Sequence, residues 1–79
     1  MMGMETLDRI TWNPNKMNGQ PCIRGMRLTV RRVVEAVSIY PNREDLWRNY
    51  PELEPEDVRQ ALAFAAASIE DSAVETPAA

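Results

Sequence analysis

Arginine is the residue type whose placement points most clearly to a binding chemistry in this chain. Residues 9–34 contain six cations and no acid. A guanidinium group donates hydrogen bonds in a fixed planar fork that suits phosphates, guanine edges and carboxylates. We therefore select Arg24, Arg27, Arg31 and Arg32 as candidate residues for binding an anionic partner, either DNA or an acidic protein surface.

An internal structural role is the competing interpretation, and for Arg27 the two interpretations carry nearly equal weight. Arg27 could form a salt bridge with an acid of the third predicted helix, such as Glu56 or Asp57, and so lock its loop. Arg31 and Arg32 fall in the first turn of a predicted helix, where cations oppose the helix dipole. That local cost favours a functional reason for these two residues.

Catalysis and metal binding have little support in the sequence. The chain has no histidine, and Cys22 is its single cysteine. The commonest general base and the commonest zinc ligand are therefore absent, and no thiolate cluster can form. Acids at positions 52, 54, 56 and 57 surround a predicted helix start, where the helix dipole accounts for them better than a metal ion does. We expect no enzymatic activity, no metal and no cofactor, and we expect Cys22 to be a small buried hydrophobe.

Length and composition indicate a single small domain of 79 residues with a net charge of -3. We expect a flexible N-terminus over residues 1–8, one domain over residues 9–69 and a disordered tail over residues 70–79. No apolar run is long enough to cross a membrane, and no signal peptide is recognisable, so we expect a cytoplasmic protein. Such small domains often gain stability by pairing, and we expect a homodimer.

Two extended segments and three helices are predicted to position the arginines. Residues 9–12 and 20–24 are strand candidates joined by turn signals, which predicts a short N-terminal hairpin or extended arm. A helical apolar stripe then begins behind Thr29, a good N-cap, and comprises Val30, Val33, Val34 and Val37. Asn42 can cap a second, short helix, and Pro55 opens a third. The predicted fold is mainly α, with three helices in a homeodomain-like helix-turn-helix arrangement.

Two stretches of the chain resemble the family called domain of unknown function 433. The first stretch is Gly19-Gln20-Pro21-Cys22-Ile23-Arg24-Gly25-Met26-Arg27-Leu28-Thr29-Val30. The second consists of Tyr50-Pro51-Glu52-Leu53, Glu54-Pro55-Glu56-Asp57-Val58 and Ala61-Leu62-Ala63-Phe64-Ala65. The resemblance covers about residues 9–66, and the order and spacing of several motifs make it specific. Met26, Tyr40-Pro41 and Glu54 depart from the family's usual pattern.

The resemblance implies a homeodomain-like helical fold and an antitoxin-like function. Such antitoxins bind and neutralise a nuclease-like toxin that resembles the PIN domain, and they bind their own operator DNA as dimers. An arginine of this chain could then block the nuclease site by forming a salt bridge with its metal-binding carboxylates. These are expectations that the resemblance supplies.

The acids of the third helix conflict with the usual DNA-docking geometry. In a helix-turn-helix protein the second helix of the motif enters the major groove. Here that helix would begin with Glu56 and Asp57, which repel phosphates. DNA would then be read by the basic segment before and within the first helix. The alternative is a protein–protein interaction module of the same fold that binds no DNA.

Overall fold

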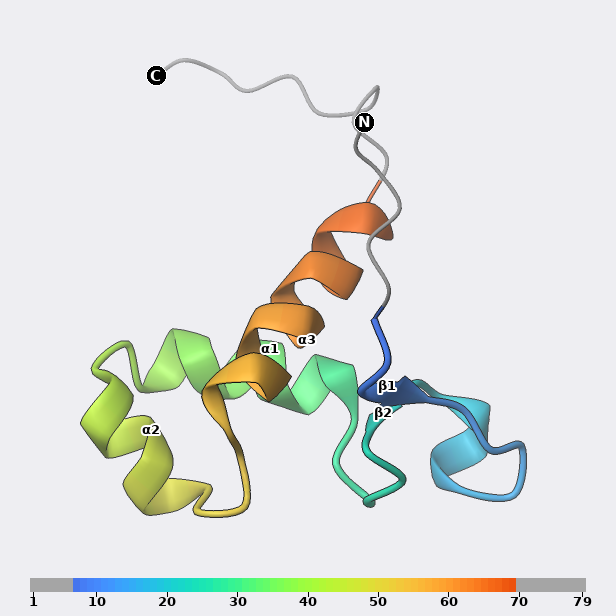
Figure 1. Cartoon of the computed structure of the whole chain (residues 1–79), viewed down its shortest axis with the longest axis horizontal. Helices are drawn as coiled ribbons and strands as arrows, with labels where there is room; N and C mark the ends of the chain where they lie inside the picture. Colours follow the sequence, from blue (N-terminus) through green and yellow to red (C-terminus); the bar gives the residue numbers. More distant parts are fainter. Residues whose placement is uncertain (1–6, 70–79) are drawn as a thin grey trace.

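The computed structural model describes residues 7–69, and six short elements make up this part of the chain (Figure 1). In chain order they are β1 (Ile10–Thr11), η1 (Met17–Gly19, a 3-10 turn), β2 (Cys22–Ile23), α1 (Val30–Ile39), α2 (Arg43–Asn49) and α3 (Pro55–Ala67). Three helices and a short hairpin confirm the prediction of a mainly α chain with an N-terminal hairpin. The flexibility expected of residues 1–6 and the disordered tail expected of residues 70–79 lie outside the described residues.

The hairpin is short because only two residues of each strand pair. Ile10 pairs with Ile23 and Thr11 with Cys22 in the antiparallel register. Ile10, Cys22 and Ile23 are all buried, so the hairpin lies on the helices and is not left to stand alone in water. The expectation that Cys22 is a buried hydrophobe is confirmed.

A tight turn reverses the chain directly after β2. The Met26 amide donates to the Ile23 carbonyl at 2.8 Å, and the Ile23 amide donates to the Leu28 carbonyl at 2.9 Å. Arg24 and Gly25 occupy the centre of this turn with φ of 47° and 71°. Glycine adopts a positive φ without strain, whereas arginine does so only at a cost that the surrounding structure must offset.

Local capping groups set the starts of the helices, as the sequence predicts. The Thr29 hydroxyl accepts from the Arg32 amide at 3.1 Å at the start of α1. The Asn42 side chain accepts from the Glu44 amide at 2.8 Å at the start of α2. Pro55 is the first residue of α3, where its missing amide proton costs no hydrogen bond.

The core lies where α1 meets α3, with the hairpin and α2 near opposite ends of α1 (Figure 1). Its fully buried apolar side chains come from the hairpin and from all three helices. They are Ile23, Val33, Ala36, Leu46 and Ala61, each 0% exposed. Trp47 and Tyr50 are partly buried and pack against this core. Trp12 differs, because it is 58% exposed and contacts the Phe64 ring at a centroid distance of 5.6 Å.

The described helices are all too short or too polar to span a membrane.

Candidate functional site

Asp57 is the most constrained ionisable residue in the described part of the chain. It lies in the first turn of α3 and has 0% exposure to solvent. Its Oδ1 accepts from Arg9 Nη1 at 2.9 Å and from Arg24 Nε at 3.0 Å. Its Oδ2 accepts from Arg24 Nη2 at 2.8 Å and from the Glu54 amide at 2.9 Å. The carboxylate is therefore bound by two guanidinium groups and one backbone amide, and we call Arg9, Arg24 and Asp57 the ion cluster.

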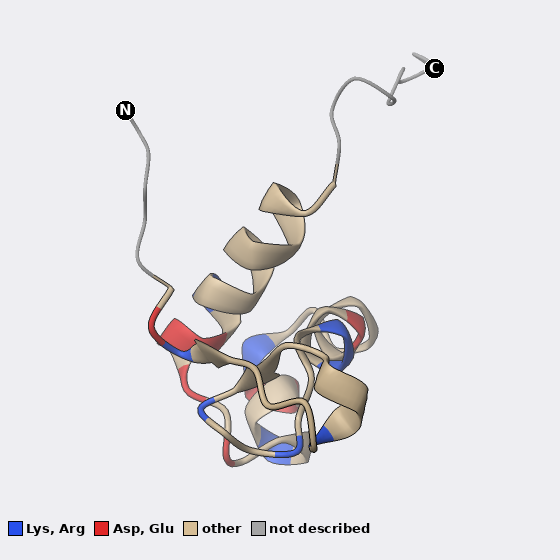
Figure 2. Cartoon of the chain, turned by 90° about the vertical axis from the view of Figure 1, so that its right-hand side faces the viewer, with Lys and Arg blue, Asp and Glu red and all other residues tan. Residues whose placement is uncertain are grey.

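The ion cluster joins three segments that are far apart in the sequence. Arg9 is the residue immediately before β1, and its Nη1 also lies 2.7 Å from Glu54 Oε1. Arg24 lies in the turn after β2, and its Nη2 donates to the Glu52 carbonyl at 2.8 Å. Gln60 of α3 accepts from the Arg9 amide at 2.9 Å. Figure 2 shows the acidic start of α3 beside the segment that leads into β1.

The surroundings of Asp57 favour its charged form. Burial alone would raise the pKa of Asp57. The hydrogen bonds from Arg24, from the Glu54 amide and from Arg9 outweigh burial and hold that pKa below its ordinary value. On the preceding residue of α3, the hydrogen bonds from Arg59 lower the pKa of Glu56 to about 2. Both carboxylates are therefore ionised at neutral pH and paired with cations of the same chain.

The structure separates the four candidate arginines into two groups. Arg24 is bound to the buried carboxylate of Asp57 and keeps 36% of its side chain exposed, whereas Arg27, Arg31 and Arg32 are exposed and contact no buried acid. The Arg31 and Arg32 side chains are 79% and 61% exposed. Both approach one carboxylate, Glu35, with N–O distances of 3.5 Å and 3.9 Å. Single exposed pairs of this kind contribute little to stability, so these guanidinium groups remain accessible to a partner.

Arg27 does not form the internal salt bridge that we weighed for it. Its guanidinium group contacts the Met17 sulfur at 4.0 Å in the neighbouring loop. In the same loop the Lys16 ammonium group donates to the Gly25 carbonyl at 2.6 Å. We call Lys16, Arg27, Arg31 and Arg32 the basic surface.

Two members of the ion cluster, Arg9 and Asp57, were not selected from the sequence. The signal for Asp57 was present, because Asp57, Ala61 and Ala65 share the i, i+4 spacing of one helix face. An acid on such a face is expected to be buried and paired. No comparable local signal marks Arg9 as its partner.

Three acids at the start of α3, Glu54, Glu56 and Asp57, pair with arginines of the same chain. Within residues 7–69 no three side chains of His, Cys, Asp or Glu converge on one point that could hold a metal ion. The sequence-based preference for a structural role of the acids around the α3 start agrees with their pairing to Arg9, Arg24 and Arg59.

Asp57→Asn tests the ion cluster directly. Removing the charge leaves Arg24 without its anion and Arg9 with Glu54 alone. Because both guanidinium groups are partly exposed, we expect the free energy of unfolding to fall by about 2–4 kcal/mol. Asp45→Asn is the matched control, because Asp45 also lies in a first helical turn but pairs with Arg48 at the surface. We expect the control to cost less than about 1 kcal/mol. Urea denaturation followed by circular dichroism measures both, and equal losses would contradict the assignment.

The lowered carboxyl pKa values predict a loss of stability in acid. Because the pKa of Asp57 is lower in the folded protein than its ordinary 3.8, its stabilising effect is fully present above that value. The effect is lost as the pH falls through the lower folded pKa, and Glu56 acts in the same direction between 4.5 and about 2. Denaturation curves from neutral to acidic pH should show a continuous fall in the free energy of unfolding below about pH 5. A constant or rising value there would refute this account.

One comparison with known proteins places the chain in a family. Residues 10–65 match the family described as protein of unknown function (DUF433). The matched range begins at β1, ends two residues before the end of α3 and includes Arg24, Asp57 and the basic surface. Neither the curated proteins nor the solved structures contain a match to the chain. Because the match covers more than half of the chain, this protein belongs to the DUF433 family.

Proposed function

We propose that this chain is an antitoxin-like regulator that binds and neutralises a nuclease-like toxin resembling the PIN domain. In this proposal α1, α2 and α3 form a homeodomain-like arrangement, with residues 50–54 as the turn between the second and third helices. The observation that carries the proposal is the accessible charge of the basic surface. Its cations lie around the start of α1, and one acid, Glu35, accompanies them.

The chemistry of the basic surface suits a carboxylate-lined partner. A PIN-like nuclease holds its metal with clustered carboxylates, and a guanidinium fork binds a carboxylate through two parallel hydrogen bonds. Arg31 and Arg32 project from a rigid helix, so they lose less freedom on binding than loop side chains do. Their position in the first turn opposes the helix dipole, and this cost supports a binding role over a stabilising one.

The structure of the α3 start favours a protein partner over DNA read by α3. Asp57 is buried in the ion cluster, and Glu56 and Glu54 are bound to arginines of the same chain. Hydrogen bonds to base edges need free donors and acceptors at this end of the helix. The acids at this end of α3 are instead paired with arginines of the same chain, Asp57 in the interior and Glu54 and Glu56 at the surface.

A binding and inhibition assay tests this proposal, with the nuclease-like protein of the adjoining reading frame if that frame encodes one. The triple variant Arg27→Ala, Arg31→Ala, Arg32→Ala should weaken toxin binding by about 100-fold, since truncating one side of close charge pairs costs roughly 2–5 kcal/mol. Arg43→Ala with Arg48→Ala is the control, because both residues are exposed on α2. Calorimetry gives the affinities, and Mg²⁺-dependent RNA cleavage gives the inhibition.

Two results would overturn the toxin-binding proposal. One is a nuclease that keeps its full activity when the unaltered chain is in large excess. The other is an equal loss of affinity in the α1 and α2 variants, which would leave no special role for the basic surface.

Operator DNA is the second candidate partner, and the clustering of Lys16 and Arg27 on adjacent loops beside α1 favours it. In a mobility shift on the upstream region of its own gene, Arg31→Ala with Arg32→Ala should weaken the shift. The double variant removes cations that oppose the dipole of α1, so it should fold at least as well as the unaltered chain. Each lost phosphate contact should lower the salt dependence of log K by about 0.9. A shift absent at low salt, or unchanged in the variant, would favour an interaction module that binds no DNA.

A further inference from the structure

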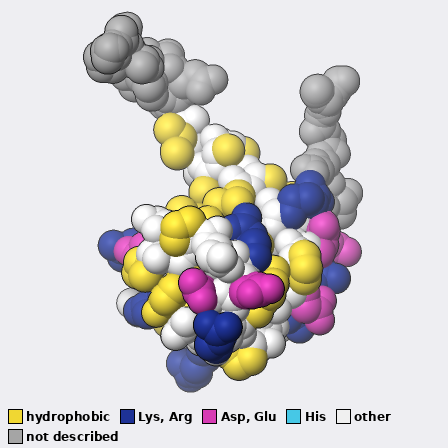
Figure 3. Space-filling model, turned by 90° about the vertical axis from the view of Figure 1, so that its left-hand side faces the viewer, with side chains coloured by type: hydrophobic (Ala, Val, Ile, Leu, Met, Phe, Trp, Pro, Cys, Tyr) yellow, Lys and Arg dark blue, Asp and Glu magenta, His cyan; other side chains and the backbone are white. Residues whose placement is uncertain are grey.

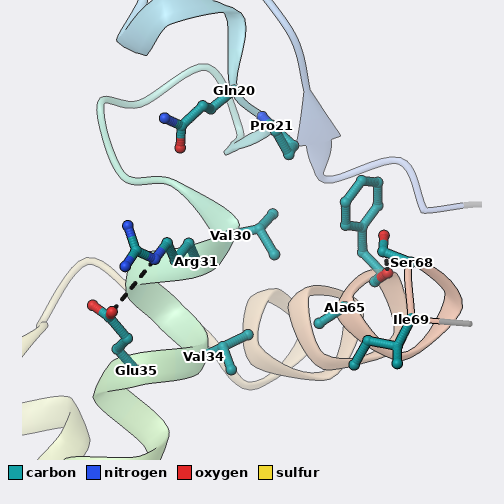
Figure 4. Close-up of a pocket in the computed structure, with 10 residues that line it drawn as sticks. Gln20, Pro21, Val30, Arg31, Val34, Glu35, Ala65, Ser68 and Ile69 are labelled. Carbon is teal, nitrogen blue, oxygen red and sulfur yellow. Dashed lines mark hydrogen bonds and ion pairs between the residues drawn. The ribbon is translucent and has the colours of Figure 1, made fainter. Parts of the chain in front are cut away.

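An apolar groove of about 340 Å³ opens between α1 and α3 (Figure 4). Its walls are formed by apolar side chains from three segments, namely Pro21, Val30, Val34, Phe64, Ala65 and Ile69. In Figure 4, Val30 and Val34 point from α1 toward Ala65 of α3 and toward Ile69, which lies two residues beyond the end of this helix. The groove is separate from the ion cluster, because it shares no residue with it.

The end of α3 beside this groove has no charged residue on any side. From Ala61 to Ile69 the sequence is Ala-Leu-Ala-Phe-Ala-Ala-Ala-Ser-Ile. Residues 66–69 are exposed, and Ile69 is 63% exposed. Figure 3 shows hydrophobic side chains on this end of α3, where it extends past the body of the domain. A helix that is apolar all round is normally covered, so this end lacks its partner surface within residues 7–69.

We infer that the groove and the end of α3 form a self-association surface, in which a second copy of this chain is the occupant. The end of α3 is apolar, as the walls of the groove are, and one chain carries both surfaces. In a two-fold dimer each patch meets the same patch of the other copy, so a self-complementary surface closes without leaving an open end. Alanines at positions 63, 66 and 67 allow the two helices to approach closely.

The charges around the groove favour a second copy over a charged partner. Arg31 and Glu35 stand together at its rim, with 3.5 Å between their side chains (Figure 4). The rim is therefore close to neutral, and two identical rims do not repel each other. The inference goes beyond the proposed function, since self-association requires neither toxin nor DNA.

Sedimentation equilibrium of the full chain, from micromolar to millimolar concentration, tests the inference. We expect a dimer, and we expect Ile69→Glu to raise its dissociation constant at least about tenfold, because a carboxylate replaces an apolar contact. Ile39→Glu is the matched control. Ile39 is 65% exposed against 63% for Ile69, ends α1 and does not line the groove. Circular dichroism verifies that both variants keep their helices.

Each outcome of this experiment decides the inference. A dimer weakened by Ile69→Glu and not by Ile39→Glu supports it. A chain that stays monomeric at millimolar concentration overturns it, whether the groove is then filled by another protein or by nothing. A dimer unaffected by Ile69→Glu, or weakened equally by both variants, places the interface elsewhere and also overturns it. All of these results are independent of toxin and DNA binding.

Discussion

The buried carboxylate of Asp57 is the interaction on which the placement of the hairpin and the helices depends. A lone carboxylate without solvent would be strongly disfavoured, so its burial requires the cations that surround it. Arg9 and Arg24 supply them from the same end of the hairpin, where the Arg24 amide donates to the Arg9 carbonyl across the two strands. Arg24 also binds the Glu52 carbonyl in the segment before α3. The hairpin has only two paired residues in each strand and would be unstable alone. These contacts fix it to the start of α3. The same contacts account for the positive φ of Arg24, since the guanidinium group fixes the turn in which this residue lies.

The ion cluster also determines which cations are left for partners. The sequence divides into a basic stretch, residues 9–34, and an acidic remainder. Folding brings parts of the two together, and Arg9 and Arg24 are used in pairing them. Arg27, Arg31 and Arg32 remain exposed on the side of the molecule where α1 begins. The proposed binding of an anionic partner therefore relies on three of the four candidate arginines, with Lys16 added by the fold.

Features that depend on neighbouring residues were predictable from the sequence, and features that depend on distant residues were not. The starts of all three helices follow from Thr29, Asn42 and Pro55, because a cap acts within one helical turn. An internal salt bridge to an acid at the start of the third helix, Glu56 or Asp57, was one of the two interpretations of Arg27. Arg24 pairs with Asp57 because the turn after β2 adopts left-handed backbone angles. An arginine in the sequence does not predict such angles. The groove between α1 and α3 could not be predicted from the sequence either, since it results from how the two helices pack.

The two ends of α3 have different environments, and this division bears on how such a small fold can bind anything specifically. Its first turn is fixed by the ion cluster, which leaves little freedom for a side chain there to adapt to DNA. Its last turns carry no charge and lie beside the apolar groove. The start of α1 carries the accessible guanidinium groups. If a second copy covers the last turns of α3, the dimer presents two basic surfaces in a fixed relation. Such a pair can bind a two-fold partner more tightly than either surface alone, because the second contact forms within one complex. Self-association and partner binding would then reinforce each other while using different chemistry on one short chain.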